Sequence, residues 1–163
     1  MSSDVIGDVV SRADPPLFVV TTAAGQERAG CVVGFATQVS IDPPRFLVAI
    51  STANRTWRVA QKATHLAVHV FGRQRMDVIT LFGAETGDDI DKFADCSWSA
   101  GPGGVPMLDA ATAWFVGSIL ERLDLGDHVG HLLAPIAGGV GTPPTEGVVT
   151  LRDAERLEPG HPA

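Results

Sequence analysis

The sequence predicts a mainly β fold, an antiparallel closed or split barrel with short peripheral helices. Runs rich in Val and Ile outnumber the segments that have helical periodicity. Strands and helices do not alternate regularly, as a parallel sheet with crossover helices would require. No G-x-G-x-x-G motif follows the first strand, so the pattern does not favour a dinucleotide-binding Rossmann fold.

Three apolar runs in the first third of the chain predict strands. Gly25 lies in the turn Ala24–Glu27 and allows the positive φ that a tight hairpin needs. Pro43 and Pro44 end the second strand, because proline cannot continue a strand ladder. The third run is almost continuously apolar, which predicts burial on both faces. These strands are Leu17–Ala23, Cys31–Ile41 and Phe46–Ser51.

The rest of the chain predicts short helices followed by two long strands. Asn54 is a suitable N-cap for the first helix, and Gly83 ends the second one. The acidic stretch Asp88–Asp91 leads into a helical patch that carries Phe93, and Gly101–Pro106 predicts a loop. The predicted helices and strands are Arg55–Lys62, His65–Phe71, Gln74–Phe82, Ala113–Leu123 and His128–Ile136, with a reversal at Asp124–Asp127.

The 163 residues favour one domain with its own hydrophobic core. We assign residues 1–140 to the barrel domain and residues 141–163 to a C-terminal extension. Beyond Gly138 the composition shifts to Gly, Pro, Thr and Glu. Val148–Leu151 predicts one edge strand, and the last ten residues predict a polar tail.

Charge and cysteine content restrict the partners and the compartment. The net charge is −7, and no cluster of basic residues along the sequence offsets it. This argues against nucleic acid or an anionic membrane as the main partner. No apolar run reaches the roughly 18–20 residues of a membrane helix, and the N-terminus lacks the pattern of a signal peptide. Cys31 and Cys96 have no metal or redox spacing, so we expect reduced thiols and a cytoplasmic protein.

The segment between Arg28 and Trp57 predicts a pocket for a flat ligand that carries a phosphate. Small residues at Gly30, Cys31 and Gly34 would let a planar ring approach the backbone. The polar cluster that follows the third strand offers hydroxyls, an amide, backbone N–H groups and one guanidinium to a phosphate. Its members are Ser51, Thr52, Asn54, Arg55 and Thr56. A mononucleotide cofactor fits this combination.

Three segments together resemble the flavin reductase-like family, which has the FMN-binding split-barrel fold. They are Arg28–Pro44, Ser51–Trp57 and the turn Gly126-Asp127-His128. Members of that family commonly show a strand of the type GMTVSSFTSVSLDPP, a second apolar strand, a Ser/Asn-Arg-Thr cluster and later a Gly-Asp-His turn. The resemblance covers roughly residues 14 to 137 and rests on the order and spacing of these motifs.

The resemblance implies a set of cofactor-binding residues and one catalytic candidate. The phosphate end comprises Ser51, Thr52, Asn54, Arg55 and Thr56, and the ring end comprises Cys31, Val32, Val33, Gly34, Phe35 and Ala36. His128 would lie near the flavin and the nicotinamide. The chain departs from the family at Val32, where threonine is common, and at Gly34 and Phe35, where two serines are common. Backbone groups would therefore read the polar edge of the ring.

The implied activity is NAD(P)H-dependent reduction of FMN, with FAD as the other flavin to consider and either NADH or NADPH as co-substrate. Hydride transfer between the two cofactors needs no protein nucleophile, so the protein supplies orientation and electrostatics. The resemblance also implies a homodimer and a partner monooxygenase that receives the reduced flavin. A flavin-binding protein without reductase activity, or an oxidoreductase that uses a deazaflavin, is the alternative.

Several residues have a second interpretation. Gly34 and Phe35 also suit a strand kink with a core aromatic, and Asp127 with His128 also suits a turn that merely closes a hairpin. His65 and His69 share a strand face, and His128 and His131 are three apart, so a small metal-binding barrel is a third hypothesis. No HExxH motif or acidic ligand at fixed spacing supports it, and we predict no metal site. Of the tryptophans, Trp57 is expected near the site and Trp114 in the core.

Overall fold

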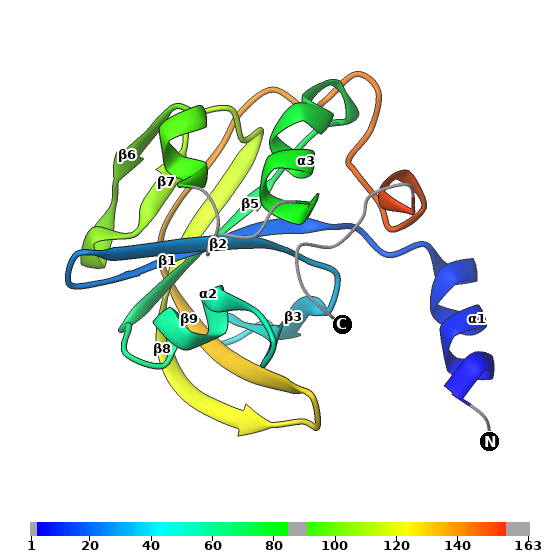
Figure 1. Ribbon diagram of the computed structural model, residues 1–163, viewed down its shortest axis with the longest axis horizontal. Helices are drawn as coiled ribbons and strands as arrows, with labels where there is room; N and C mark the ends of the chain where they lie inside the picture. Colours follow the sequence, from blue (N-terminus) through cyan, green and yellow to red (C-terminus); the bar gives the residue numbers. More distant parts are fainter. Residues whose placement is uncertain (1–2, 85–90, 156–163) are drawn as a thin grey trace.

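The computed structural model describes residues 3–84 and 91–155 and consists mainly of one antiparallel sheet (Figure 1). Its strands are β1 (Phe18–Ala24), β2 (Glu27–Val33), β3 (Ala36–Ser40), β4 (Arg45–Ser51), β5 (His65–Val70), β8 (Ala113–Asp124) and β9 (His128–Val140). The seven strands are hydrogen-bonded in the order β2-β1-β5-β8-β9-β4-β3. The predicted class, mainly β and antiparallel with a few short helices, is confirmed.

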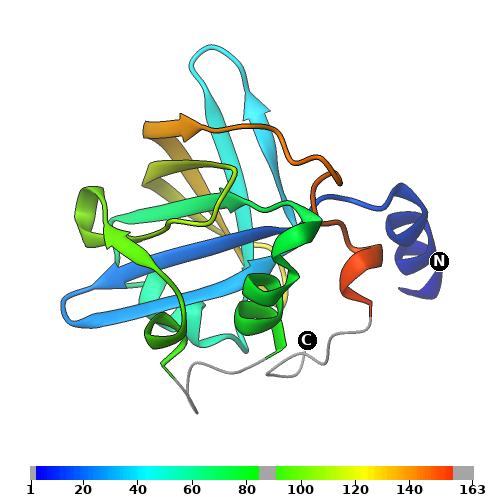
Figure 2. The same cartoon turned by 90° about the horizontal axis from the view of Figure 1, so that it is seen from above.

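Short helices and one small hairpin surround the sheet. The α-helices are α1 (Ser3–Ala13), α2 (Arg55–Ala60) and α3 (Met76–Ala84), and the 3₁₀ turns are η1 (Arg73–Arg75), η2 (Lys92–Asp95), η3 (Pro102–Gly104) and η4 (Arg152–Ala154). The strands β6 (Trp98–Ala100) and β7 (Pro106–Leu108) pair with each other in a separate sheet. Helix α1 projects away from the sheet at one side of the molecule (Figures 1 and 2).

The predicted strand Cys31–Ile41 is wrong as a single strand. It is interrupted at Gly34 and Phe35, and its two halves, β2 and β3, form the opposite edges of the sheet. Phe35 still contacts the sheet through its backbone, because its carbonyl oxygen accepts a hydrogen bond of 2.9 Å from the Ala49 N–H. Since only two residues link the two edges, the sheet has to curve until these edges approach each other. Whether this curved sheet is a split barrel stays a prediction.

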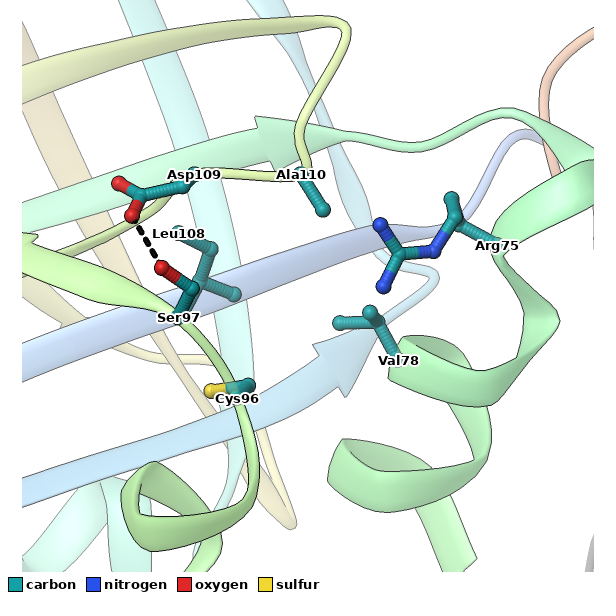
Figure 3. A pocket seen from close by; sticks show the side chains of 7 residues that line it. All are labelled: Arg75, Val78, Cys96, Ser97, Leu108, Asp109 and Ala110. Atoms are coloured by element: carbon teal, nitrogen blue, oxygen red, sulfur yellow. Dashed lines mark hydrogen bonds between the residues drawn. The ribbon is translucent and has the colours of Figure 1, made fainter.

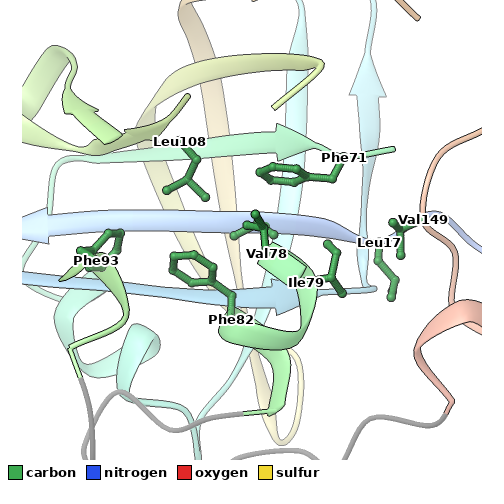
Figure 4. Close-up of a cluster of buried hydrophobic side chains, with 9 residues drawn as sticks. Leu17, Phe71, Val78, Ile79, Phe82, Phe93, Leu108 and Val149 are labelled. Atoms are coloured by element: carbon green, nitrogen blue, oxygen red, sulfur yellow. The ribbon is translucent and has the colours of Figure 1, made fainter. Parts of the chain in front are cut away.

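Strand β2 lies between two hydrophobic clusters, and successive side chains alternate between them. Cys31 and Val33 belong to a buried cluster with residues of β1, β4, β5 and β9. Val32 packs against the other cluster, in which Phe82 and neighbouring side chains of α3 cover the sheet (Figure 4). This period-two alternation is the normal consequence of strand geometry.

Four further features differ from the sequence predictions or lie outside the description. The predicted loop Gly101–Pro106 is the connection of the β6–β7 hairpin, and α1 was not predicted. Val148–Leu151 makes isolated bridges, Gly72 to Val148 and Pro16 to Thr150, in place of an edge strand. Val149 is nonetheless fully buried in the cluster beneath α3. Most of the acidic stretch Asp88–Asp91 and the chain beyond residue 155 lie outside the described residues.

Candidate functional site

The predicted phosphate end forms a compact loop between β4 and α2. Ser51 ends β4, and its hydroxyl oxygen accepts a hydrogen bond of 3.2 Å from the Ala53 N–H. Asn54 is the N-cap that the sequence predicted, because its side-chain oxygen accepts a bond of 2.8 Å from the Thr56 N–H. The other end of α2 is held by Arg122, which donates to the carbonyl oxygens of Ala60 and Ala63 at 3.0 and 2.7 Å. The short helix is thus fixed at both ends.

Arg55 is half-buried and already engaged with β2 and the β1–β2 turn. Its guanidinium donates a hydrogen bond of 2.7 Å to the carbonyl oxygen of Arg28 and lies 4.0 Å from the carboxylate of Glu27. Lys62 also pairs with Glu27 at 2.8 Å, and this hydrogen bond is the main reason that the pKa of Glu27 lies below its usual range. Arg55 therefore belongs to a small charge network with a defined geometry.

The elements around Arg55 carry a local excess of positive charge in an acidic chain. Arg28, Arg55, Arg58 and Lys62 lie on β2, on α2 and just after α2, and Glu27 is the acidic residue among them. A phosphate needs positive charge together with hydroxyl and N–H donors, and this loop supplies both. The residues present therefore fit the phosphate of a flavin nucleotide.

The turn before β9 docks onto the phosphate loop. The backbone N–H and the hydroxyl of Thr52 both donate to the carbonyl oxygen of Asp127, at 2.9 and 3.2 Å. Ser51 is also the register partner of His128 across β4 and β9. The structure thus brings together two segments that the sequence separates by about 75 residues.

His128 is oriented by its neighbour and by Phe35. Its Nδ1 lies 2.7 Å from the carboxylate of Asp127, so Nδ1–H is the donor and the carboxylate is the acceptor. The ring of Phe35 lies beside it, with centroids 5.0 Å apart and a tilt of 54°. The side chain of Phe35 is 56% exposed, so its interpretation as a core aromatic is wrong. Phe35 contacts His128 and Thr52 contacts Asp127, so the turn Asp127-His128 joins the two residues.

In the rest of the predicted ring end, Cys31 and Val33 face the protein interior, whereas Val32, Gly34 and Ala36 are half-buried. Cys31 and Val33 are buried, and burial raises the pKa of the Cys31 thiol above its ordinary value. Gly30 is small because Phe82 packs against it: an added Cβ would lie 2.8 Å from that ring. At Gly34 an added Cβ would lie 3.2 Å from Leu17. Internal packing thus explains the small residue at Gly30, while Gly34 has a tight contact with Leu17 alone.

A sequence profile described as the flavin reductase like domain matches residues 10–150, most of the chain. The chain belongs to the flavin reductase-like family. The matched range contains the phosphate loop, the interruption at Gly34 and Phe35, and the turn that carries His128.

Two curated relatives illustrate the similarity within the family. The chain is 32% identical over 114 residues to the reductase subunit Stc3 of stachydrine N-demethylase from Rhizobium meliloti, which covers 68% of this chain and 48% of that protein. It is 29% identical over 121 residues to the FMN reductase (NADH) RutF of Klebsiella pneumoniae, which covers 74% of this chain and 73% of that protein. The chain spans about half the length or less of several curated relatives that it matches.

A solved structure supports the same placement in the family. The crystal structure of an FMN-binding protein from Thermus thermophilus with bound 1-cyclohex-2-enone superposes with a TM-score of 0.73 at 26% identity. The superposition covers 78% of this chain and 71% of that chain. The fold of this chain, with its curved antiparallel sheet, is therefore similar to the fold of an FMN-binding protein.

The three tryptophans of this family member lie in different environments, and the expectation that Trp57 lies near the flavin stays a prediction. Trp57 is half-buried and packs against the cluster that contains Ile50 and Ala60. Trp114 is half-buried and packs against a small core cluster. Trp98 stacks beneath the guanidinium of Arg28, whose Cζ lies 4.8 Å from the ring centroid.

The other histidines have structural environments. His69 is fully buried, its Nδ1 lies 2.9 Å from the carbonyl oxygen of Val19, and its Nε2 accepts a hydrogen bond of 3.0 Å from the Leu108 N–H. Burial lowers the pKa of His69 to about 4 and also lowers the pKa of His131. Residues 3–84 and 91–155 contain no group of three or more His, Cys, Asp or Glu side chains placed to hold a metal ion.

A surface pocket of about 260 Å³ lies between α3 and the β6–β7 hairpin (Figure 3). Its lining residues are Arg75, Val78, Cys96, Ser97, Leu108, Asp109 and Ala110. The Arg75 guanidinium is already paired with Asp77 at 2.9 Å, and Ser97 donates to Asp109. Burial raises the pKa of the Cys96 thiol, which does not favour a reactive thiolate. The pocket shares no residue with the predicted flavin site.

In the part of the chain that the structure describes, no helix has both the length and the apolar character needed to cross a bilayer.

Proposed function

We propose that this chain is an NAD(P)H-dependent flavin reductase that reduces FMN, or FAD, and supplies it to a partner monooxygenase. The observation that carries the proposal is the docking of Asp127 onto Thr52. This contact joins the turn that carries His128 to the loop that carries Arg55, and Phe35 lies beside His128, which supports one shared site. Family membership and a relative named as the reductase subunit of an N-demethylase support the same function.

The phosphate loop would hold one end of the flavin. Arg55 supplies a guanidinium whose fork geometry suits phosphate. Its hydrogen bond to the Arg28 carbonyl oxygen, and the bond that Asn54 Oδ1 accepts from the Thr56 N–H, keep the loop in place. The hydroxyls of Ser51 and Thr52 lie on the same loop. We expect Arg55 to contribute most, because a charge-assisted hydrogen bond is stronger than a neutral one.

The opposite end of the site would hold the ring and the nicotinamide. Bound flavin supplies the hydride-accepting chemistry, and the protein orients the two rings. Because Asp127 binds Nδ1–H, the Nε2 atom of His128 is the nitrogen left to meet a ligand. His128 would then orient the nicotinamide or interact with the negative charge of reduced flavin.

The proposal includes a split barrel, a homodimer and a cytoplasmic location. The linkage of the two sheet edges through Gly34 and Phe35 supports the barrel. Exposed apolar side chains on β3, β8 and β9 support an interface between copies; they include Val39, Leu120, Ile136 and Val140. Light scattering coupled to gel filtration should give a mass of about twice 17.1 kDa, and a monomer at micromolar concentration would contradict the dimer.

Nicotinamide oxidation tests the activity. Purified protein is mixed with FMN and either NADH or NADPH, and the loss of the nicotinamide absorbance band is followed against a protein-free control. We expect oxidation with at least one of the two nicotinamides. A rate no higher than the control, with both nicotinamides and with both FMN and FAD, would reject the reductase.

A second candidate is a flavin-binding protein without reductase activity, or one that uses a deazaflavin. The observation that favours it is the lack of polar side chains from Cys31 to Ala36. Flavin that remains bound through gel filtration while neither nicotinamide is oxidised would favour a binding protein. Oxidation with a deazaflavin but not with FMN would favour the other alternative.

A further inference from the structure

Phe35 is an exposed aromatic side chain in an unusual position. Of the large apolar residues that are exposed to solvent in the described part of the chain, Phe35 is the only aromatic residue. It lies in the two-residue connection between the two edges of the sheet and touches His128. Burying a phenylalanine is favourable, so leaving 56% of this side chain in water has a cost in free energy that a bound ring would recover.

The backbone around Phe35 is held in place, so its ring is presented by a fixed element. Its carbonyl oxygen accepts a hydrogen bond from the Ala49 N–H in β4, and the next residue, Ala36, is in register with Val48. On the other side, a Cβ added at Gly34 would lie 3.2 Å from the side chain of Leu17, so the space beside the connection is narrow. Neither Gly34 nor Ala36 has a side chain long enough to cover the ring. The exposed face of Phe35 therefore stays open.

The side chains that precede Phe35 offer no polar group to a ligand, so stacking is the main interaction by which this end of the site would recognise a planar ring. Cys31 and Val33 face one hydrophobic cluster and Val32 the other. Phe35 and His128 are already in contact, so a ligand ring would lie on the open face of Phe35 and not between the two rings.

We propose that Phe35 is a specificity-determining residue that stacks against the ring of the flavin, so that the site recognises a planar tricyclic ring by shape and not by the atoms of its polar edge. This inference rests on the proposed function, because it assumes that a flavin binds here. It names the ligand class more closely: flavins and 5-deazaflavins with the same phosphorylated side chain should bind with similar affinity.

The test measures the dissociation constants of FMN and of 5-deaza-FMN with the full chain and its variants, by fluorescence titration. The unmodified chain should bind both compounds within about threefold of each other. In Phe35→Ala both affinities should fall by about tenfold, the size expected for loss of an aromatic stack. Phe35→Trp should restore both to within about threefold. The visible absorption band of bound FMN should shift in the parent and in Phe35→Trp but less in Phe35→Ala.

Ile41→Ala is the matched control. Ile41 is 84% exposed and lies in the turn between β3 and β4, so the variant also removes an exposed apolar side chain and should change both affinities less than twofold. Thermal unfolding should show that all variants stay folded.

Three outcomes separate this inference from the proposed function. If the parent binds no FMN, the proposed function fails and this inference fails with it. If the parent binds FMN but Phe35→Ala binds it equally well or more tightly, only this inference is overturned. A preference of the parent for FMN over 5-deaza-FMN of more than about tenfold would also overturn it, because one edge atom would then decide the affinity.

Discussion

The two ends of the candidate flavin site use different physical interactions. At the phosphate end, Arg55 and Lys62 form a charge network with Glu27, and the loop carries hydroxyl and amide groups. At the ring end, Cys31, Val32 and Val33 of β2 pack into hydrophobic clusters, and Phe35 is the group exposed beside His128. The comparison teaches that charge would select the phosphate, whereas the aromatic face of Phe35 would bind the ring.

The difference follows from where each end lies in the fold. The phosphate loop leaves the sheet after β4 and enters a short helix; Ser51 and Thr56 are buried there, whereas Thr52, Asn54 and Arg55 stay partly exposed and are available to a ligand. Strand β2 instead has a hydrophobic cluster on each face, and a strand has only two faces. A polar side chain placed between Cys31 and Val33 to meet a ligand would therefore point into one of these apolar clusters.

The largest expected effect is a loss of folding stability at low pH. It limits the pH range in which ligand binding at the two ends can be compared in folded protein. His69 has a pKa of about 4 in the folded protein against 6.5 when unperturbed. The unfolded chain therefore binds the proton first, and the free energy of unfolding should be highest above pH 6.5 and fall as the pH drops toward 4. The full loss is on the order of 3 kcal/mol.

Chemical unfolding at pH 7.5, 6 and 5 measures this effect. His69→Gln should be less stable at pH 7.5, because a buried hydrogen bond is lost, and should show a flatter dependence on pH. His131 contributes in the same direction, since its pKa is also lowered by burial. A free energy of unfolding that is constant from pH 7.5 to 5 would contradict the assignment of His69 as a neutral core residue.

The second effect tests the phosphate end. Arg55→Ala should weaken FMN binding by about 10- to 100-fold, since a hydrogen bond to a charged group contributes about 1.5–3 kcal/mol. Riboflavin, which lacks the phosphate, should bind to the variant and to the parent with affinities within about threefold. Isothermal titration calorimetry of both compounds gives the comparison.

Arg58→Ala is the control for this experiment, because it removes the same charge from the exposed surface of the same helix. It should change FMN affinity by less than about threefold, as expected for a screened surface charge. Equal losses of FMN and riboflavin affinity in Arg55→Ala would show that Arg55 maintains the loop through Arg28 and does not meet the phosphate.

The smallest effect tests the ring end. Val32→Thr introduces the residue that is common at this position in the family, but the side chain packs beneath α3. The free energy of unfolding should fall by about 1–3 kcal/mol if the hydroxyl finds no partner, while the dissociation constant of FMN should change less than about twofold. Tighter FMN binding in this variant would show that position 32 meets the ring and would remove the contrast between the two ends.

Local signals in the sequence were sufficient for many elements. Asn54 was predicted as an N-cap and is one, and Gly25 has the positive φ expected for the first hairpin. The helix predicted over Gln74–Phe82 corresponds to η1 and α3. These features depend on residues within a few positions of each other, so their chemistry can be read from the chain directly.

Contacts between distant segments were not predictable in the same way. Gly34 and Phe35 continue the apolar pattern of a strand, and only the pairing of β2 with β1 and of β3 with β4 shows where the strand is interrupted. Likewise, the motif of small residues at Gly30 and Gly34 did not reveal that Phe82 and Leu17 occupy the space beside them. The docking of Asp127 onto Thr52 has no local signal at all.

The sequence by itself determined the antiparallel β class, the polar cluster from Ser51 to Thr56 and, through its motifs, the resemblance to flavin reductases. The tertiary structure decided which of the predicted residues come together: Phe35 contacts His128, and Thr52 contacts the turn that carries His128, whereas Cys31 and Val33 are buried. The physical reason is that residue type and spacing set what a segment is able to bind or bury, but the face that each side chain presents depends on long-range strand pairing.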